Sequence, residues 1–558
     1  MSAKWFDPRD LLFKSPFGAV PCGADVSFCF RPERGAAVTR CELLAHGEFA
    51  DQWTTVELTP AQEDGHVVYR GIFTAPDDVE LVWYHFRLSW ADGGTSCYGK
   101  NGLCAWDAVE PWQLTVYDDT HKTPAWFGRG VTYQIFPDRF RRAKSRDVAG
   151  LVGPRTLHEN WDELPEYRPN AEGEITCSDF FGGDLQGITE KLDYLASLGV
   201  TTLYLCPIFE ASTNHRYDTA CYERIDPLLG DEADFRTLCA EAKKRGIYVM
   251  LDGVFNHTGR KSVYFNADSF YDDLGAAQGE QSPYYRWYNF HPFPDEYDAW
   301  WGIKNLPAVN ELEKSYVDYI IEGDNSIIKR WLRAGASGWR LDVADELPDE
   351  FIAKIRAAMN EENPDTYLLG EVWEDGTTKI AYSQRRKYLL GRETNGLMNY
   401  PFRTALMAYL LGGGAEYFRD SMEELRENYP APAFYGAMNF LSTHDTPRLL
   451  TILGLTSPAP QTRDERAVYQ LSDSDLARGM SLLKLAALIL YTFPGSPMLY
   501  NGDEAGMQGF ADPFNRGTSP WGRAHSSAAR RVGTHCSSPS SPSHYTPPPP
   551  PPPHPLPP

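Results

Sequence analysis

Long apolar runs are missing from this sequence of 558 residues. Its most apolar stretch, residues 480–493, is interrupted by Lys484 and followed by Pro494. A bilayer-spanning helix needs about 20 apolar residues, so this stretch predicts a buried helix instead. The first 20 residues also lack the apolar core of a signal peptide. We therefore expect no membrane partner, and we expect the chain in the cytoplasm.

Paired cysteines and an excess of positive charge are missing as well. None of the ten cysteines belongs to a C-x-x-C pair, which argues against a zinc site and predicts reduced, structural thiols. The net charge of -23 opposes binding to a phosphate backbone, so nucleic acid is not an expected partner. The same charge is compatible with a neutral substrate.

Aromatic residues, by contrast, are abundant at 13%, with 15 Trp and 31 Tyr. Such rings stack on sugars, but they also fill the core of a β-sandwich, so composition alone leaves both interpretations open. Residues 1–124 contain short apolar segments such as VSFCF and HVVYRGIF, bounded by Gly, Pro and Asp turns. This pattern predicts a small N-terminal β-sandwich.

From residue 125 to residue 522 apolar strands alternate with amphipathic helical segments. About eight strands can be counted, which predicts an α/β fold, a (β/α)8 TIM barrel. Residues 256–320 interrupt the alternation after the third strand with an irregular, aromatic-rich sequence, so we expect an inserted subdomain there. Residues 523–558 are rich in Ser and Pro and cannot build a core, so we expect a disordered tail.

Carboxylates stand at the ends of several predicted strands, where barrel enzymes place their catalytic groups. Asp252 ends the third strand, Asp342 the fourth and Glu371 the fifth. Arg340 precedes Asp342 by two residues, so both side chains share one face of the strand, and the arginine is expected to keep the aspartate ionised. Retaining glycoside hydrolysis needs one carboxylate that attacks and one carboxylic acid that protonates the leaving oxygen.

Each of these residues alone also supports a more ordinary interpretation. An aspartate at a strand end is more often a helix N-cap, and an Arg-x-Asp pair is usually an exposed ion pair. His257 and His444, after the third and seventh strands, would singly be structural histidines. The joint pattern, with three carboxylates at three strand ends, is what favours glycoside chemistry.

Four segments carry a resemblance to a known family: DGVFNH, GWRLDVADE, GEVW and FLSTHD, which begin at positions 252, 338, 370 and 440. Supporting segments are YQIFPDRF, FFGGDLQGI, NHRYDT and the stretch 494–516. In this order they resemble glycoside hydrolase family 13, the α-amylase family. Within it they are most similar to the branch of neopullulanases, cyclomaltodextrinases and maltogenic amylases, and the resemblance covers residues 133–516.

The resemblance implies a role for each matching residue. Asp342 is similar to the family's nucleophile and Glu371 to its general acid/base. Asp445 is similar to the residue that binds ring hydroxyls and stabilises the distorted transition state. Other matching positions are implied to bind substrate or to support the residues that do, namely Tyr217, Asp252, His257, Arg340, Glu346, Trp373, His444 and Arg516.

The resemblance also bears on cofactors and partners. It implies that no cofactor is required, although Asn256 is similar to a calcium ligand of many relatives, which leaves calcium as an alternative. Residues 1–124 resemble a family 34 carbohydrate-binding module. In this branch such a module packs over a partner's barrel, so we expect a homodimer for an intact homologue. The expected partners are α-glucan oligosaccharides and polysaccharides.

The sequence departs from the family at three places. Cys221 stands where an aspartate is expected, and Asp345-Glu346 stands where Asn-Glu is commoner. Both are expected beside the sugars on the leaving-group side, which leaves the bond preference open. After Arg516 relatives continue with an eighth helix and a C-terminal β-sandwich, whereas here a Ser- and Pro-rich tail follows. We interpret this tail as a frame shift or truncation that would uncover an apolar patch and leave the chain poorly soluble or inactive.

The predicted function is hydrolysis of α-1,4-glucosidic bonds, with some α-1,6 cleavage, by a retaining double displacement. Cyclodextrins, pullulan, starch and maltooligosaccharides are the candidate substrates. An exo-acting α-glucosidase or a transglycosylase is the alternative among enzymes. An inactive glucan-binding protein is the alternative of another class, because the barrel is predicted to be incomplete.

Overall fold

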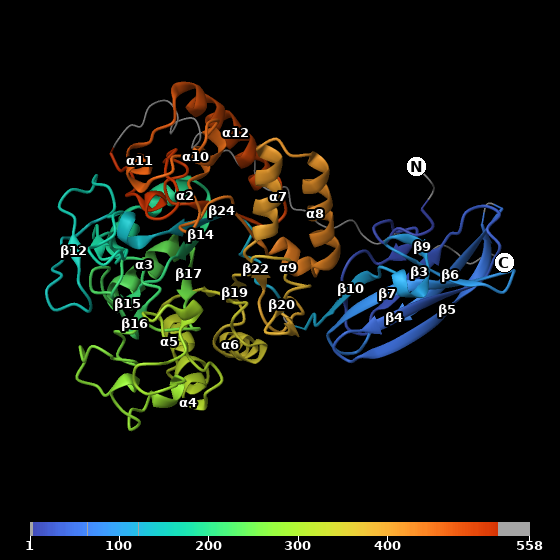
Figure 1. Ribbon diagram of the computed structural model, residues 1–558, viewed down its shortest axis with the longest axis horizontal. Helices are drawn as coiled ribbons and strands as arrows, with labels where there is room; N and C mark the ends of the chain where they lie inside the picture. Colours follow the sequence, from blue (N-terminus) through green and yellow to red (C-terminus); the bar gives the residue numbers. More distant parts are fainter. Residues whose placement is uncertain (1–3, 64, 121, 523–558) are drawn as a thin grey trace.

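The computed structural model describes residues 4–63, 65–120 and 122–522. In these residues the chain forms an N-terminal β-sandwich and, beside it, a larger α/β barrel (Figure 1). Among the described helices, none combines the length and the apolar character that crossing a bilayer would require. The predictions for residues 523–558, a disordered tail in place of a further helix and sandwich, lie outside the described residues.

The N-terminal sandwich, called the module below, closes around aromatic side chains. Its strands, in sheet order, are β1 (Lys14–Ser15), β3 (Asp25–Phe30), β6 (His66–Thr74), β5 (Gln52–Glu63), β4 (Val38–Gly47), β7 (Glu80–Trp90), β10 (Trp112–Tyr117) and β2 (Val20–Pro21), with β8 (Thr95–Gly99) and β9 (Gly102–Cys104) beyond β7. Alternate side chains point inward, so Phe28 contacts Tyr84 and Phe30 contacts Phe86, with ring centroids 5.2 and 4.8 Å apart. These contacts join the β3 side of the sandwich to the β7 side.

Eight parallel strands form the barrel, as the sequence predicts. In sheet order they are β22 (Gly396–Leu397), β19 (Tyr367–Gly370), β18 (Gly338–Leu341), β17 (Tyr248–Gly253), β14 (Val200–Leu205), β11 (Val131–Ile135), β24 (Ser496–Tyr500) and β23 (Met438–Asn439). A parallel bridge between Met398 and Met438 joins the two ends of this order. The sheet therefore closes on itself.

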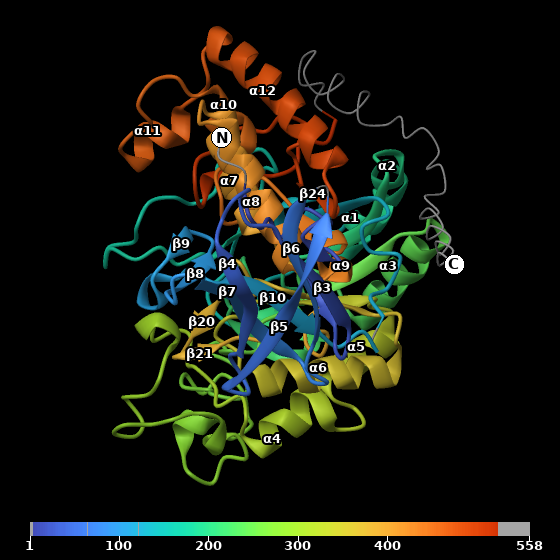
Figure 2. The same ribbon diagram turned by 90° about the vertical axis from the view of Figure 1, so that its right-hand side faces the viewer.

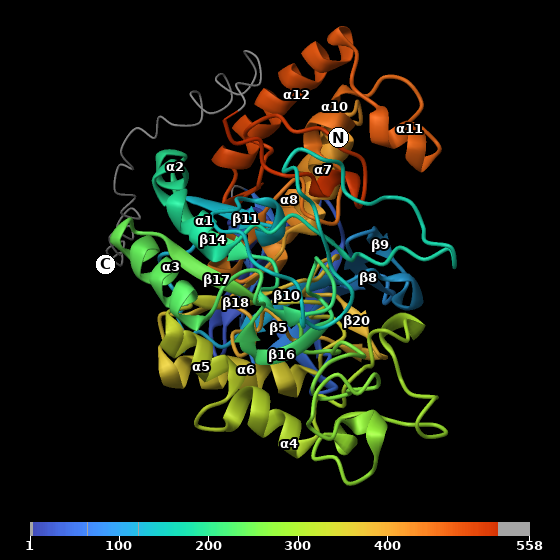
Figure 3. The ribbon, with the colours of Figure 1, turned by 90° about the vertical axis from the view of Figure 1, so that its left-hand side faces the viewer.

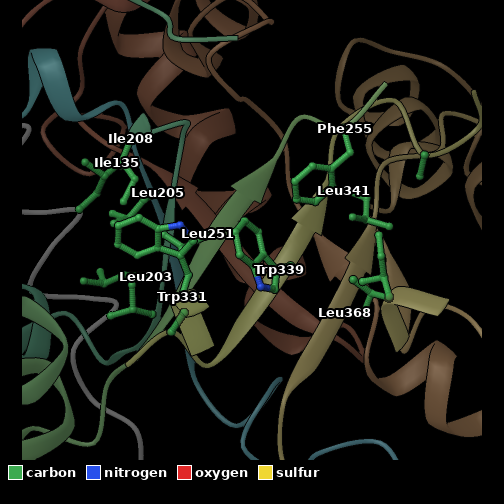
Figure 4. Packing of buried hydrophobic residues seen from close by; sticks show 14 of the residues in the cluster. Ile135, Leu203, Leu205, Ile208, Leu251, Phe255, Trp331, Trp339, Leu341 and Leu368 are labelled. Atoms are coloured by element: carbon green, nitrogen blue, oxygen red, sulfur yellow. The ribbon is translucent and has the colours of Figure 1, made fainter. Parts of the chain in front are cut away.

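Side-chain alternation along these strands separates an outer core from an inner one. Leu251, Trp339 and Leu368 point outward and pack under the surrounding helices (Figure 4). Their strand neighbours Met250 and Leu369 belong to a separate cluster inside the barrel. The residues two positions farther along each strand share this inward side, so alternation brings polar groups to the C-terminal end of the barrel.

Helices cover the outside of most strands (Figure 3). In chain order they are α1 (Leu185–Glu190), α2 (Leu192–Ser197), α3 (Glu232–Lys244), α4 (Lys314–Val317), α5 (Ile327–Ala334), α6 (Asp349–Glu362), α7 (Tyr400–Leu410), α8 (Ala415–Asn428), α9 (Ala431–Tyr435), α10 (Leu449–Gly454), α11 (Arg463–Val468) and α12 (Asp473–Thr492). The expected alternation of strands and helices is interrupted once. Residues 371–395, all of them described, form no helix between β19 and β22. A hairpin of β20 (Ile380–Ala381) and β21 (Gln384–Arg385) takes its place.

The module lies against the barrel on the side of β20 and of α7 to α9 (Figure 1). Several ion pairs connect the module to the barrel. Arg9 of the module is 2.8 Å from Glu427 on α8, and Arg392 of the barrel is 2.8 Å from Asp78 and 2.9 Å from Asp118 of the module.

Residues between β17 and β18 leave the barrel at its lower edge (Figure 2). This irregular segment, where the sequence predicts an inserted subdomain, packs around its own rings: Phe265 lies 4.9 Å from Tyr288 and 4.7 Å from Tyr297. Two shorter excursions were not predicted. They are the paired strands β12 (Thr156–Leu157) and β13 (Asp179–Phe180), and the paired strands β15 (Phe209–Ala211) and β16 (Thr219–Ile225).

The apolar stretch 480–493 lies almost wholly in α12, which is buried on one side only. Leu483 and Leu490 face the core, whereas Leu488 is 61% exposed, so the predicted buried helix is buried on one face. Leu483, Leu490, Leu198 and Leu499 of β24 line an apolar groove. The apolar patch that the sequence predicts to be uncovered would lie at this groove. The segment on which that prediction rests lies outside the described residues.

The close spacing of β18 and β19 yields a test of the fold. A Cβ added to Gly338 would lie 2.3 Å from the carbonyl oxygen of Tyr367, and backbone cannot move aside as a side chain can. We expect Gly338→Ala to lower the free energy of unfolding by about 1–3 kcal/mol in a denaturant titration. Gly94→Ala is the control, because there an added Cβ meets only the end of the Asp92 side chain, and a loss as large in the control would contradict this account.

Candidate active site

A cavity of about 700 Å³ opens at the C-terminal ends of the barrel strands. Nine of the predicted site residues line it: Tyr217, His257, Asp342, Glu346, Glu371, Trp373, His444, Asp445 and Arg516. Asp252 and Arg340 lie buried beneath and contact the residues that line it. Asn256 is beside the cavity and does not line it.

The guanidinium of Arg340 holds the acidic residues together. Its Nη1 donates to Asp342 and to Asp252, each at 2.7 Å, and its Nη2 lies 2.6 Å from Glu371. Strand register explains this meeting, because Arg340 on β18 pairs with Asp252 on β17, while Glu371 directly follows β19. Asp342 and Glu371 therefore bind the two nitrogens of one buried cation and lie side by side.

The residue after Asp342 is strained. Val343 has a φ of 40°, in the left-handed region that β-branched residues rarely adopt. In this conformation its N–H donates to Oε2 of Glu371 at 3.0 Å. The strained turn thus links the end of β18 to the carboxylate that follows β19, which is the kind of position where proteins store strain for function.

The other oxygen of Glu371 is held by two aromatic residues. Oε1 accepts from the Tyr400 hydroxyl at 3.0 Å and from the indole N–H of Trp373 at 3.2 Å. The two rings stack at 4.6 Å with an angle of 12° between their planes. Glu371 is thereby oriented on both oxygens before any substrate binds.

Tyr217 forms one side of the cavity and is fixed by a chain of hydrogen bonds. Gln134 donates to Nδ1 of His444 at 2.8 Å, so the imidazole proton lies on Nε2, which is 2.7 Å from the Tyr217 hydroxyl. The hydroxyl in turn donates to Asp252 at 2.9 Å. The rings of Tyr217 and His444 are parallel within 7°, at 5.3 Å.

The two histidines that the sequence predicts for the site are neutral at neutral pH. Burial lowers the pKa of His257 to about 4. Burial, helped by the positive charges of Arg516 and Arg340, lowers the pKa of His444 well below its usual value. Neutral imidazoles here serve as hydrogen-bond partners and not as the general acid. The ring of His257 packs against Trp300 at 5.2 Å, on the wall of the cavity.

Asp445 keeps one side of its carboxylate open to the cavity. Arg516 donates to Oδ1 at 3.2 Å, and Nε2 of His444 lies 3.2 Å from Oδ2. Arg516 also donates to the carbonyl of His444 at 2.9 Å and pairs with Asp512 at 3.2 Å. These contacts leave the Asp445 carboxylate, which is 38% exposed, free to accept hydrogen bonds from a ligand.

The residues beyond Glu371 form another side of the cavity. Glu346 accepts from the indole N–H of Trp301 at 2.7 Å, and Lys379 bridges Asp345 at 3.1 Å and Glu374 at 2.7 Å. Cys221, expected beside this side, lies instead in the outer hydrophobic core and does not line the cavity. The expectation for Cys221 is wrong because β16 directs its side chain under the helices, whereas Asp345 and Glu346 do line the cavity.

Three carboxylates share the single positive charge of Arg340. Burial raises the pKa of Asp342 well above its usual value, and the charges of Glu371 and Asp252 add to this effect, while Arg340 opposes it. Burial and the neighbouring carboxylates therefore oppose the ionisation of Asp342, which the sequence expects Arg340 to favour.

Asn256 lies between Glu311 and His257. The Asn256 amide donates to Glu311 at 3.1 Å, and its oxygen lies 3.3 Å from Nδ1 of His257. Burial raises the pKa of Glu311 to about 7. Within residues 4–63, 65–120 and 122–522, no three His, Cys, Asp or Glu side chains form a group that could hold a metal ion.

Sequence reasoning missed several residues of the site. Gln134 lies on the first strand, Tyr400 begins the helix after the sixth strand, and Val343 acts through its backbone. Trp301 and Lys379 come from segments outside the strand ends. A polar or aromatic residue near each strand end would have identified the first two, but no sequence signal marks the others.

The contribution of Arg340 to the site can be tested through its effect on the free energy of unfolding. Arg340→Met leaves three buried carboxylates without a counter-charge, so we expect unfolding to become easier by about 3–5 kcal/mol at pH 7. A carboxyl with a raised folded pKa destabilises above its unfolded pKa and ceases to do so as the pH falls, so the deficit should shrink toward pH 5. Arg236→Met, which breaks an exposed pair with Glu232, is the control and should cost under about 1 kcal/mol at both pH values. An Arg340→Met deficit independent of pH would contradict the shared-cation account.

Comparisons with known proteins agree with this geometry. The family model "Alpha amylase, catalytic domain" matches residues 134–534. An amylopullulanase of Thermoanaerobacter thermohydrosulfuricus is 37% identical over 93% of this chain, and neopullulanase 2 of Thermoactinomyces vulgaris is 31% identical over 87% of it. The alignments cover 37% of the first relative and 75% of the second, so this chain spans well under half the length of the amylopullulanase.

A solved structure extends the similarity over both parts of the fold. The type III pullulan hydrolase from Thermococcus kodakarensis is 28% identical, with a TM-score of 0.64 over 95% of this chain and 86% of its own. The family match covers more than half of the sequence and includes every strand-end carboxylate of the cavity. The chain therefore belongs to the α-amylase family of glycoside hydrolases.

Proposed function

We propose that this chain hydrolyses α-glucosidic bonds with retention of configuration, with Asp342 as nucleophile and Glu371 as general acid/base. The observation that supports this best is the pair of carboxylates that Arg340 holds side by side on the cavity floor. In retaining enzymes the two carboxyl groups are about 5–5.5 Å apart, and we expect that spacing here.

In the first half-reaction the Asp342 carboxylate attacks the anomeric carbon while the glycosidic bond breaks. The leaving oxygen takes the proton of Glu371, so the departing sugar is neutral and Glu371 becomes a carboxylate. In the second half-reaction Glu371 takes a proton from water, and the water oxygen displaces Asp342 at the same carbon. Both residues then regain their starting charges.

The proposed chemistry requires an ionised Asp342 and a protonated Glu371. Positive charge develops on the ring at the anomeric carbon, next to Asp342, and this charge favours the ionised aspartate. Arg340 donates to the acidic residues throughout and limits the cost of burying them.

The remaining cavity residues can position the ring that reacts. Tyr217 offers an aromatic face, and Asp445, which Arg516 supports, can accept hydrogen bonds from two ring hydroxyls. The neutral imidazoles of His444 and His257 lie on the same cavity wall. No step in this scheme needs a metal ion, and we propose that hydrolysis is independent of calcium.

The substrate class is proposed from relatives. Those described above are named amylopullulanase, neopullulanase and pullulan hydrolase, and other relatives are named cyclomaltodextrinase. We propose α-1,4 cleavage with some α-1,6 cleavage in pullulan, cyclodextrins, starch and maltooligosaccharides. An exo-acting α-glucosidase, a transglycosylase and an inactive glucan-binding protein are the alternatives that a substrate panel separates.

The module is proposed to bind glucan. Trp53 and Trp106 are 53% and 55% exposed, and their rings lie 6.1 Å apart on one face of the sandwich. Exposed paired rings suit sugar stacking. The expected homodimer, with this module at a partner's barrel, stays a prediction from the family resemblance. A cytoplasmic location is likewise proposed, and a similar protein of Bacillus subtilis is named intracellular maltogenic amylase.

A panel of substrates tests the proposed reaction. We expect β-cyclodextrin and pullulan to release reducing sugar faster than maltose releases glucose. An exo-acting α-glucosidase would show the reverse order. Asp342→Asn should lower the rate on the order of 10⁴-fold or more, because no carboxylate is left to attack. Its melting temperature should not fall, because a buried ionisable group with a raised pKa is removed.

The exposed helix residue Asp473 provides the control: Asp473→Asn should leave the rates unchanged and should lower the melting temperature only slightly, since its charge lies in the first turn of α12. A wild-type chain that binds these glucans without cleaving any of them would favour the glucan-binding alternative.

Stereochemistry tests the mechanism separately. Two displacements at one carbon restore the original configuration, so the first sugar released should be the α-anomer. Proton NMR during the first minutes of maltohexaose hydrolysis distinguishes it from the β-anomer, before mutarotation mixes the two. A β-anomer as first product would overturn the role of Asp342 as nucleophile and would assign it to activating water.

A further inference from the structure

The hairpin of β20 and β21 replaces the helix that the barrel lacks between β19 and β22. It begins at Lys379, which lines the cavity, and it lies between the module and the segment inserted after β17 (Figure 2). Ile380 pairs with Arg385 and Ala381 with Gln384, so Tyr382 and Ser383 form a two-residue turn at its tip. Neither the proposed chemistry nor the family motifs assign this tip a role.

The turn contains two residues that rarely adopt its backbone conformation. Tyr382 has a φ of 49° and Ser383 a φ of 62°, the pattern of a type I′ turn, which strongly prefers Asn and Gly. A bulky residue at positive φ is a genuine outlier. Tyr382 is also 74% exposed, so the tyrosine side chain gains little from burial in return. Its presence at this position therefore has no explanation in the stability of the fold.

The base of the hairpin is fixed on two sides. Arg386 is buried and donates to Asp349 at 2.5 Å and to the backbone carbonyls of Asp345 and Leu347. On the other side Arg385 donates to Glu48 of the module at 2.9 Å. Because the base of the hairpin is held in place, Tyr382 at its tip is already positioned. A ligand that binds Tyr382 therefore loses little free energy to ordering of the hairpin.

The base of the hairpin lies on the side of the cavity beyond Glu371, because Lys379 lines that wall. Tyr382 is three residues from Lys379, about 10 Å along an extended chain. Although the Tyr382 side chain is largely exposed, partial burial of its phenol raises the pKa, and the negative charges of Glu346, Glu311 and Asp345 add to this effect, so these carboxylates lie near it. Trp301, 79% exposed and bonded to Glu346, lies on this same side of the cavity.

We propose that Tyr382 binds a glucosyl unit on the leaving-group side of the scissile bond and so determines the preference for long glucans. This inference rests on the proposed hydrolysis. Glu371 protonates the leaving oxygen, so sugars that leave must pass the residues next to it, and the hairpin base is among these. An exposed phenol offers an apolar ring face to the C–H groups of a sugar and a hydroxyl to its oxygens.

The test compares substrates that differ only in what lies on the leaving-group side. Maltohexaose places glucose units there, whereas α-maltosyl fluoride places none. Tyr382→Asn removes the ring and puts a residue that tolerates positive φ into the turn. We expect KM for maltohexaose to rise about two- to tenfold, kcat/KM for the fluoride to stay unchanged, and the melting temperature to stay equal or rise.

Two further variants complete the design. Tyr382→Phe keeps the ring and should remain near the wild type on both substrates. Tyr435→Asn removes another exposed tyrosine, near the opposite end of the barrel, and should change neither substrate. Equal losses on both substrates, or no loss on maltohexaose, would overturn the role of Tyr382. An inactive wild type on both substrates would instead refute the proposed hydrolysis, so the two failures are distinguishable.

Discussion

The guanidinium of Arg340 is the interaction on which the rest of the site depends. Three carboxylates from three adjacent strands contact it inside the barrel, next to an apolar cluster. Without this cation their mutual repulsion and burial would cost several kcal/mol per charge. With it, each of the three carboxylates lies within 2.7 Å of a guanidinium nitrogen, which offsets much of that cost. The same contact that makes the acidic cluster tolerable also sets the geometry of its two reactive members.

Much of the architecture follows from local sequence pattern. Apolar strands that alternate with amphipathic helices predict a barrel, and the closing bridge at Met398 and Met438 shows that the strand count was right. Strand-end carboxylates are predictable for a similar reason. Side chains alternate along each strand, and the parallel register places Asp252 beside Arg340 on the neighbouring strand. These features depend on short-range periodicity, which a single sequence displays directly.

Contacts between distant segments could not be predicted this way. Gln134 reaches His444 across 310 positions, and Tyr400 reaches Glu371 from another strand end. The hairpin at Tyr382 has strands of two residues each, too short for any periodicity. Cys221 illustrates the opposite error, since a motif position suggested the cavity while the side chain points into the outer core. Side-chain direction in irregular segments is decided by packing, which sequence spacing does not encode.

The charged joint between module and barrel has a consequence for how the enzyme meets its surroundings. Arg385 with Glu48, and Arg392 with Asp118, connect the two parts through partly exposed pairs. Such pairs weaken as dissolved ions screen them, whereas the apolar cores on either side strengthen slightly with most salts. Ionic strength therefore acts on the contact between module and barrel more than on either core. Through the pair of Arg385 with Glu48 it also acts on one of the two attachments of the hairpin base.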